Sequence, residues 1–442
     1  MSLRETEILV VGAGPAGIAA ATAAAGRDRR VLVLDDNASA GGQIWREGID
    51  AAKGRTPSGR ARAMAMFQDP GAELLPGRRV VDAPQPKVLQ TLVEDADGSR
   101  TESFRFDKLI LATGARERFL PFPGWTLPGV FGAGGLQALV KGGYEVAGKR
   151  IVVAGSGPLL LAVAVHLQEY GAKIVCVAEQ APLRQVMRFA ASLWSHPAKL
   201  LQGAGYRAAL AGVPYRTGYW PVAAGGGGWV ESVRLTDGRR IWDEPCDLLA
   251  CGFHLVPNTE LASLLGCEIK DGFVAVDGQQ RTSVPDVFCA GEPTGIAGVE
   301  AAQTQGAIAG LAASVAGVEM RRLAGRRARH DTFTKRLAAV FELREELRSL
   351  AAPDTIVCRC EDVTFAQLEG RSSWTDAKLQ TRCGMGPCPA RICGPAVQTL
   401  FGWQAPSVRP PIFPVPVSVF CGGSRPSTMH ASAPTINLQE TS

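Results

Sequence analysis

The sequence lacks any long uninterrupted run of apolar residues. A membrane-spanning helix needs about 18 or more such residues in a row, and every apolar run of this chain is interrupted well before that length. The first residues, MSLRETEILVV, also lack the layout of a signal peptide, because their apolar run meets Gly12 too early. We therefore expect no transmembrane segment and a cytoplasmic location.

Cysteine is absent from Met1–Val130, and the C-x-x-C spacing of a redox dithiol does not occur. A dithiol mechanism is thereby excluded. Histidine is scarce as well, because the chain has five histidines and none lies in a recognisable motif. We therefore expect no substrate base in this chain and assign it no catalytic residue.

Strong charge of one sign is also missing. The net charge is +5 over 442 residues, and the one basic cluster, near Arg321–Arg329, fits a solvated helix face. Without a basic stripe or an aromatic stacking platform, nucleic acid is excluded as a partner. The length and the 46% of hydrophobic residues indicate a globular protein of about two to four domains.

A nucleotide-binding motif occupies Ile8–Ala21, ILVVGAGPAGIAAA. The aliphatic run predicts a strand that stops at Gly12. Gly14 permits close approach of the backbone to a pyrophosphate, and Gly17 permits close packing of the following helix on the strand. The next predicted strand ends at Asp35, where a carboxylate can accept hydrogen bonds from ribose hydroxyls. These features predict a dinucleotide at the helix N-terminus.

A second unit of the same kind begins with a strand at Arg150–Val153. Gly155 and Gly157 predict its turn, and its second strand ends near Glu179. The third glycine of the motif is replaced by Leu160, which should push the helix away from the strand. Two alternatives therefore remain for the second unit. It binds NAD or ATP, or it is an inherited domain that has lost nucleotide binding and has only a packing role. No arginine follows Glu179, which favours NADH over NADPH.

Five cysteines gather late in the chain, in CRCEDVT and TRCGMGPCPARICG. Two close pairs, Cys358 with Cys360 and Cys383 with Cys388, could hold zinc or an iron–sulfur cluster. The spacing typical of zinc knuckles is absent, and the glycines after Cys383 would let backbone N–H groups approach cluster sulfides. We therefore favour [2Fe–2S] over zinc. For the isolated cysteines, burial is the expectation.

Several motifs taken together resemble one family. They are GAGPAG, GGQIWR, LATGARERFLPFPGWTLPGV, GSGPLLL, CAGEPTGIAGVEAA and the cysteine segments, from about Glu7 to Val417. They look like the FAD-containing α subunits of heteromeric amine and imino-acid dehydrogenases, the family of opine oxidase, D-hydroxyproline dehydrogenase and hydrogen cyanide synthase. The resemblance implies an α/β fold with two dinucleotide-binding domains, of the glutathione-reductase-like Rossmann type. A small C-terminal [2Fe–2S] domain would follow, similar to that of bacterioferritin-associated ferredoxin (BFD).

The resemblance also assigns site residues by position. The FAD adenosine diphosphate would be bound by Gly12, Gly14, Gly17 and Asp35, and lined by Gly42, Gln43, Thr113, Gly114, Gly291 and Glu292. The predicted cofactor-binding set is completed by Pro15, Ala16, Asp36, Val81, Ala112 and Gln303. The cluster ligands would be Cys358, Cys360, Cys383 and Cys388. Pro389-Ala390 departs from the family's usual Gln-Gly, so Cys393 stays open as a substitute ligand.

The expected domain order follows from the same motifs. It is 1–125 and 253–320 for the two parts of an FAD-binding domain, 126–252 for an inserted NAD-binding-like domain, 321–352 for a helical connector, 353–420 for the BFD-like domain and 421–442 for a tail. The connector is expected to be helical from about Arg321 to Leu350 and to end at Pro353.

The predicted function is that of an electron-transferring α subunit. The resemblance implies a D-amino-acid-oxidase-like β subunit with its own FAD, which oxidises the C–N bond of an opine, D-hydroxyproline, a similar secondary amine or glycine. It also implies a small ferredoxin-like γ subunit in some complexes, FMN as a further cofactor candidate at the subunit interface, and an acceptor such as quinone reached by peripheral membrane association. Two alternatives remain, a stand-alone NADH-dependent ferredoxin-type reductase and a scaffold whose nucleotide is structural.

Overall fold

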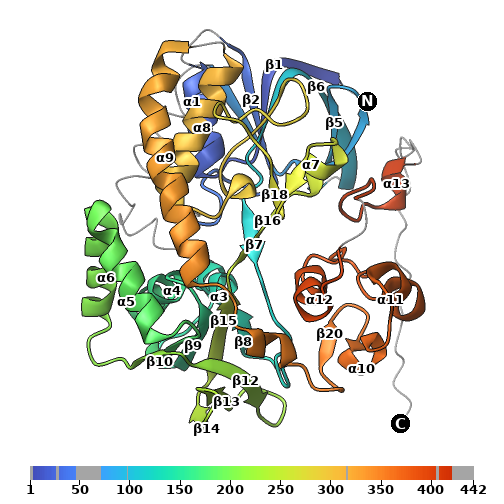
Figure 1. Ribbon diagram of the computed structural model, residues 1–442. Helices are drawn as coiled ribbons and strands as arrows, with labels where there is room; N and C mark the ends of the chain where they lie inside the picture. The colour runs from blue at the N-terminus through green and yellow to red at the C-terminus, as the bar shows by residue number, and fades with distance from the viewer. Residues whose placement is uncertain are drawn as a thin grey trace, which may run out of the picture.

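The computed structural model describes residues 3–25, 29–45, 71–96, 98–314, 317–404 and 408–420. The predicted tail 421–442, which includes Cys421, lies outside these ranges, as does Arg46 at the end of the predicted GGQIWR loop. The described part of the chain forms two α/β units and a smaller region that carries the late cysteines (Figure 1). We call them the first unit, the second unit and the cysteine region.

The first unit is built on a seven-stranded sheet of order β3-β2-β1-β6-β5-β4, with β19 pairing with β6. Its strands are β1 (Leu3–Val11), β2 (Val31–Asp35), β3 (Ala72–Pro76), β4 (Arg79–Gln85), β5 (Val88–Asp95), β6 (Gly98–Leu111) and β19 (Val287–Cys289). The strands β3, β2, β1, β6 and β19 run parallel, whereas β4 and β5 are antiparallel. Parallel strands that are covered on both faces read as continuous apolar runs, as Ile8–Val11 of β1 and Val31–Leu34 of β2 do.

The second unit has a parallel five-stranded sheet of order β11-β10-β9-β15-β8. Its strands are β8 (Val130–Gly132), β9 (Arg150–Ser156), β10 (Lys173–Glu179), β11 (Tyr215–Thr217) and β15 (Leu248–Phe253). An antiparallel meander follows β11 and consists of β12 (Trp220–Gly225), β13 (Ser232–Thr236) and β14 (Ile241–Pro245). The helices are α3 (Ala133–Lys141), α4 (Leu159–Glu169), α5 (Leu183–Ser192) and α6 (Pro197–Ala209), with the short η2 (Leu193–Ser195) between the last two.

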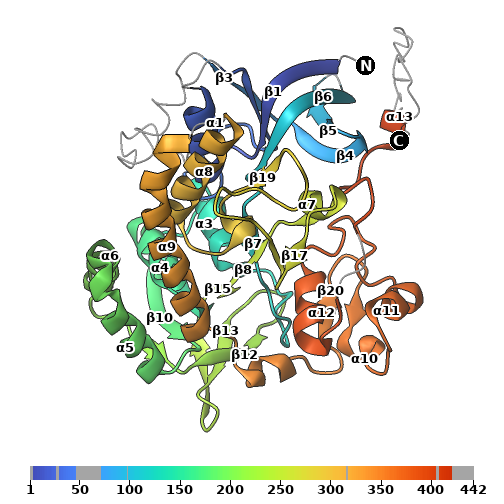
Figure 2. The same cartoon turned by 45° about the horizontal axis from the view of Figure 1, so that its top comes forward.

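Two antiparallel strands connect the units, β7 (Ala115–Glu117) and β16 (Leu255–Pro257). Figure 2 shows β7 leading from the first unit toward the second. Glu117 ends β7, and its carboxylate accepts hydrogen bonds from the backbone N–H groups of Gly134 and Gly135 in α3, at 2.6 and 2.9 Å. Because a helix N-terminus attracts a carboxylate, this contact fixes the start of α3 against β7.

The chain returns to the first unit through α7 (Glu260–Leu264), β17 (Ile269–Lys270), β18 (Phe273–Val274) and η3 (Glu292–Thr294). Three helices pack together on that unit: α1 (Pro15–Ala25) contacts α8 (Val299–Ala313), and α8 contacts α9 (Gly317–Val340). The close contact of α1 with α8 depends on two glycines of α8. A Cβ on Gly306 would lie 2.1 Å from the carbonyl oxygen of Ala16, and one on Gly310 would lie 2.2 Å from that of Ala20.

The connector differs from its predicted extent. The helix α9 ends at Val340, ten residues before the predicted end at Leu350, and the short η4 (Glu345–Ser349) follows it. Figure 1 shows α9 running from the first unit to the second. Phe341, directly after the helix, is only 2% exposed. The helix therefore ends where the chain turns inward to bury this ring.

The cysteine region contains β20 (Ile356–Cys358), β21 (Val363–Thr364), α10 (Phe365–Leu368), α11 (Trp374–Thr381) and α12 (Cys393–Phe401). A last helix, α13 (Val417–Phe420), follows a segment that returns to the first unit. Ile412 belongs to that segment and packs into the apolar core under β4, β5 and β6. Among the described residues, no helix combines the length and the apolar character that crossing a membrane requires.

Candidate cofactor and metal sites

The turn after β1 is shaped by contacts that leave no room for side chains. Gly12 has a φ of +104°, and a Cβ at this position would lie 2.2 Å from the carbonyl oxygen of Ala112. A Cβ on Gly17 would lie 1.7 Å from the carbonyl oxygen of Gly12, so α1 rests directly on the turn. Both glycines therefore have the packing roles that their spacing predicts.

The loop after β2 lies across this turn. The N–H of Gly41 donates a hydrogen bond to the carbonyl of Ala13, at 2.8 Å. A Cβ on Gly14 would find Gly42 Cα as its nearest neighbour at 3.8 Å, and a Cβ on Gly42 would lie 2.9 Å from Gly14 Cα. Turn and loop thus form a cradle without side chains at the N-terminus of α1, which is what a pyrophosphate needs. Gln43 lies at the rim of this cradle and is exposed.

Asp35 ends β2 and holds the turn and the loop in place. Its Oδ2 accepts a hydrogen bond from the N–H of Ala13 at 2.5 Å, and its Oδ1 accepts two bonds from Asn37, each at 2.7 Å. An ionised carboxylate has about four acceptor sites, so one remains for a ribose hydroxyl. Asp36 is half exposed and pairs with Arg79 at 3.0 Å, and so supports the edge of β4.

The parallel strands of the first unit end side by side at this edge of the sheet. The N–H of Ala112 donates to the carbonyl of Val11 at 2.8 Å, and the N–H of Ala290 donates to that of Leu111 at 2.9 Å. The predicted pair Gly291 and Glu292 follows directly. A Cβ on Gly291, which has a φ of +84°, would lie 2.9 Å from Cβ of the predicted residue Ala16, at the start of α1. Three chain segments far apart in sequence therefore meet at one place.

Glu292 adds a half-buried acid to this edge. Burial raises the pKa of its carboxyl group above the usual range. The neighbouring Gly291 donates its N–H to Oε1 of Gln305, at 2.9 Å, which ties η3 to α8. The predicted residue Gln303 lies near the start of the same helix and is half buried.

Two further residues of the predicted cofactor-binding set, Pro15 and Val81, have roles within the fold itself. Pro15 is the first residue of α1, where its missing N–H costs no hydrogen bond. Val81 is 3% exposed, and its carbonyl oxygen accepts a hydrogen bond from the N–H of Ile412 at 2.9 Å. The C-terminal segment therefore already uses the backbone acceptor at Val81.

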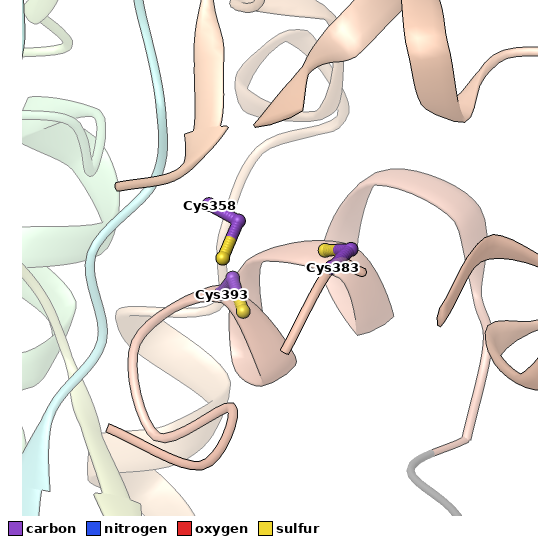
Figure 3. A group of neighbouring side chains, drawn as sticks. All are labelled: Cys358, Cys383 and Cys393. Carbon is purple, nitrogen blue, oxygen red and sulfur yellow. The ribbon is translucent and has the colours of Figure 1, made fainter. Parts of the chain in front are cut away.

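Three cysteines of the C-terminal region form a compact buried group. The side chains of Cys358, Cys383 and Cys393 have their sulfur atoms within 4.8 Å of one another, and each residue is at most 2% exposed. Figure 3 shows the three side chains converging on one space. We call them the cysteine group. Cys393, which the sequence leaves as a substitute ligand, is a member, whereas Cys360 and Cys388 are not.

The acidities of the cysteine group show that the three thiols compete for one negative charge. Hydrogen bonds from Cys383 and Cys393 lower the pKa of Cys358 to about 2. The hydrogen bond with Cys358 in turn raises the pKa of Cys383 to about 12, and the pKa of Cys393 is raised as well. Because like charges at this distance repel, all three thiols ionise together only around a cation. This donor set fits a thiolate-bound metal centre.

Cys360 and Cys388 form an outer pair beside this group. Their thiols lie within hydrogen-bonding distance of one another, Cys360 is exposed and Cys388 is half buried. The loop from Cys383 to Cys388 packs closely against Cys360, because a Cβ on Gly386 would lie 2.2 Å from Cys360 Cβ. The N–H of Gly384 donates to the sulfur of Cys358. The four predicted ligands are thus divided between the two sets, with two in each.

Asn258 connects the first unit to the cysteine region. Its backbone N–H donates to the carbonyl of Gly114 at 2.9 Å, and its side-chain amide donates to the carbonyl of Thr113 at 2.8 Å. The hydroxyl of Thr113 in turn donates to the carbonyl of Asn258, at 2.6 Å. The predicted cofactor-lining residues Thr113 and Gly114 are therefore held by one residue that the sequence does not single out.

Two arginines extend this connection to the cysteines. Oδ1 of Asn258 accepts hydrogen bonds from Arg116 at 2.7 Å and from Arg391 at 3.0 Å. Arg116 also donates to the backbone carbonyl of Arg391 at 3.0 Å, and Glu260 pairs with Arg116 at 2.8 Å. Arg391 lies in the loop between Cys388 and Cys393. We call Asn258, Arg116, Arg391 and Glu260 the bridge.

The bridge carries excess positive charge in a partly buried place. Burial lowers the pKa of Arg116, and the nearby Glu260 opposes that shift. Two guanidinium groups face one carboxylate, so the bridge favours negative charge beside it. Sequence reasoning missed this cluster because Arg116, Asn258 and Arg391 lie more than 130 positions apart from one another. The one available signal is an arginine between two cysteines of the predicted ligand loop.

Comparison with known proteins places the chain in a family. The model of the pyridine nucleotide-disulphide oxidoreductase family matches residues 6–306. The A-type subunit of the opine oxidase of Agrobacterium tumefaciens is 32% identical over 91% of this chain and 87% of its own length. The HcnB subunit of the hydrogen cyanide synthase of Pseudomonas aeruginosa is 32% identical over 93% of this chain and 97% of its own length.

Solved structures agree on the fold. The crystal structure of L-proline dehydrogenase from P. horikoshii superposes with a TM-score of 0.64 over 95% of this chain and 80% of that chain, at 18% identity. The predicted fold class, a two-dinucleotide-binding-domain α/β fold with cysteines in a small C-terminal region, is thereby confirmed. The chain belongs to the pyridine nucleotide-disulphide oxidoreductase family and is a relative of the A-type subunits of opine oxidase and the HcnB subunits of hydrogen cyanide synthase.

Proposed function

We propose that this protein is the electron-transferring α subunit of a heteromeric flavin- and iron–sulfur-dependent dehydrogenase. Its partner would be a D-amino-acid-oxidase-like β subunit that oxidises the C–N bond of an opine, D-hydroxyproline, a similar secondary amine or glycine. The proposal is supported by relatives that are named as subunits of opine oxidase and hydrogen cyanide synthase. The observation that carries it is the bridge, which joins Thr113 and Gly114, at the carboxyl edge of the first unit's sheet, to the cysteine region.

The first unit fits FAD by the shape of its backbone. Gly12, Gly14, Gly17 and Gly42 leave the turn open to a pyrophosphate, and Asp35 stands where a ribose would lie. Thr113, Gly114, Gly291 and Glu292 would line the cofactor at the carboxyl edge of the sheet.

The cysteines fit a [2Fe–2S] cluster or, as the competing assignment, a zinc ion. A cluster takes four thiolates, and five cysteines lie in this region. We propose that the four ligands come from these five, with Cys358 and Cys383 common to the predicted set and the cysteine group. When bound, flavin and cluster would supply one- and two-electron redox chemistry. The bridge arginines would hold positive charge beside them.

Partners and acceptor complete the proposal. A heteromeric assembly fits a chain in which no substrate base was found from sequence, because substrate oxidation would then take place in the β subunit. A small ferredoxin-like γ subunit, FMN at the subunit interface and a quinone acceptor at a membrane surface belong to the same assignment.

The alternative is a stand-alone NADH-dependent ferredoxin-type reductase. The observation that favours it is the turn Gly155–Gly157 in the second unit, which repeats the turn of the first. Rapid bleaching of the flavin of the isolated chain by NADH would support this alternative over the proposed function.

The test is co-expression of the chain with its genomic neighbours. We expect a visible spectrum of flavin plus cluster, stoichiometric iron and acid-labile sulfide, and dye-linked oxidation of an opine, D-hydroxyproline, another secondary amine or glycine. Cys358→Ser should abolish the iron and keep the flavin. The matched control, Cys246→Ser, alters a buried cysteine of the second unit and should keep both. Zinc in place of iron would overturn the cluster, and no oxidation of any of these amines would overturn the function.

A further inference from the structure

The second unit repeats the first unit's device for holding its turn. Oε2 of Glu179 accepts a hydrogen bond from the N–H of Gly157 at 2.7 Å, and its Oε1 accepts one from the N–H of Ala181 at 2.9 Å. Asp35 of the first unit bonds Ala13 and Asn37 at the same sequence offsets, 22 residues before it and two after it. In such units a nucleotide lies across the carboxyl ends of the strands, with its adenosine beside this acid.

In the second unit this place is covered by the chain itself. Residues 341–344, which directly follow α9 and which we call the strap, lie over the ends of β9 and β10. Ser156 donates its hydroxyl to the carbonyl of Phe341 at 3.1 Å. The side-chain amide of Gln180 donates to the carbonyl of Glu342 at 3.0 Å, and its oxygen accepts from the N–H of Arg344 at 3.3 Å.

Two large side chains anchor the strap at its ends. The Phe341 ring meets the ring of Phe189 edge-on, with centroids 5.4 Å apart. The Arg344 guanidinium lies over the ring of Trp220, 4.2 Å from its centroid, and also pairs with Glu346 at 2.6 Å. A buried aromatic ring and a cation–π contact on the buried Trp220 ring each contribute to docking, so the strap is held by packing as well as by hydrogen bonds.

The two units differ at this point in a way that bears on nucleotide binding. Gln180 directly follows the acid of the second unit, as Asp36 does in the first. Gln180 and Glu179 are 0% exposed, whereas the Asp36 side chain is 52% exposed. The turn itself remains free, because a Cβ on Gly157 would meet nothing within 4 Å. The strap therefore covers the adenosine side of the second unit and leaves its phosphate turn uncovered.

We propose that the strap is the resident occupant of the second unit's nucleotide site. While it is docked, the unit takes neither a nicotinamide dinucleotide nor ATP, because both need room for adenosine. The unit then acts as a fixed support for the connector that leads to the cysteine region. This inference stands independently of the proposed function, because it concerns only the second unit and residues 341–344.

The test is a calorimetric titration of the full chain, with NADH in one experiment and with ATP in another. We expect no binding of either probe to the wild type up to about 1 mM. The double variant Phe341→Ala/Gln180→Ala, which loosens the strap, should gain at least tenfold in affinity for both probes. Glu342→Ala is the matched control, since this side chain is exposed and only its backbone carbonyl is used; it should behave as wild type.

Each contrary result would overturn the proposal. Wild-type binding of NADH or ATP in the micromolar range, traced to the second unit by loss on Gly157→Trp, would show that the strap does not close the site. A folded double variant that gains no affinity would show that something else does. If the double variant does not fold, hydrogen exchange of residues 341–344 in the wild type decides: it should be slow and unchanged by NADH or ATP, and a change caused by either would overturn the inference.

Discussion

At the scale of residues, the acids that end β2 and β10 have a structural role beside any role in binding. Asp35 and Glu179 each accept backbone N–H bonds from the glycine turn of their own unit. The sequence predicts where these acids lie, because the strand length and the turn fix that position. It does not predict how strongly Glu179 is desolvated, because its burial is tertiary: the adjoining Gln180 bonds Glu342 and Arg344, more than 160 positions away.

The acidity of Glu179 gives a prediction for pH. Burial raises the pKa of its carboxyl group to about 7, and Tyr215 is the titratable group that interacts with it. Since the folded protein binds this proton more tightly than the unfolded chain, its contribution to stability is fully present below pH 4.5 and is lost as the pH rises through 7. We expect Glu179→Gln to remove a stability difference on the order of 2 kcal/mol between pH 5 and 7.5.

Urea unfolding of the wild type and of the variant at both pH values measures this difference. Other groups contribute a background slope that the two proteins share, so only the difference between the slopes counts. Equal slopes would contradict the assignment to Glu179.

At the scale of elements, the strand–turn–helix of the first unit is the part that the sequence predicts best. The contact of Gly17 with Gly12 is local, because the spacing of the motif alone brings the two together, whereas the contact of Gly12 with Ala112 is long-range. The predicted connector helix is less accurate, since α9 ends at Val340 rather than at Leu350. Its end is set by the burial of Phe341 in the second unit, a tertiary contact that propensity does not contain.

Gly14 and Gly17 should separate binding from stability. A Cβ on Gly17 would overlap the carbonyl of Gly12, so Gly17→Ala should lower the free energy of unfolding of the apoprotein by about 1–3 kcal/mol or more. A Cβ on Gly14 meets only an ordinary contact at 3.8 Å. Gly14→Ala should therefore leave the apoprotein within about 0.5 kcal/mol of wild type but strongly reduce its FAD content, because the methyl group enters the cradle.

Urea unfolding of the two apoproteins and FAD release from the two purified proteins make the comparison. If Gly14→Ala kept its full FAD content, the cradle would not be the pyrophosphate site.

At the scale of the whole molecule, the bridge is what sequence reasoning could not find. It joins Thr113, Asn258 and Arg391, which come from the first unit, from the position directly after β16 and from the cysteine region. No periodicity or motif spacing relates positions so distant. The sequence predicts that these cysteines gather, yet the choice between Cys393 and Cys388 depends on how the loop that carries Arg391 is held.

Removing Arg391 should loosen the cysteine region. Arg391→Ala deletes a hydrogen bond to Asn258 and a contact with the ring of Phe413. We expect amide exchange in α12 to accelerate about tenfold or more, since a hydrogen bond to a charged group contributes about 1.5–3 kcal/mol. Arg348→Ala is the control, because Arg348 is 57% exposed and its partner Glu345 is 78% exposed. Equal exchange in both variants would show that the bridge does not hold the region.

The order of the strands in the first sheet has a consequence for synthesis on the ribosome. The sheet takes its strand β19 only after the whole second unit has been made, since β6 ends at Leu111 and β19 begins at Val287. At roughly 5–20 residues per second, this strand emerges about 10–35 s after its neighbour. During that interval the edge of β6 that will pair with β19 is unsealed, while the second unit, continuous in the chain, can already fold. The sheet of the first unit can therefore be completed only after the second unit has been synthesised.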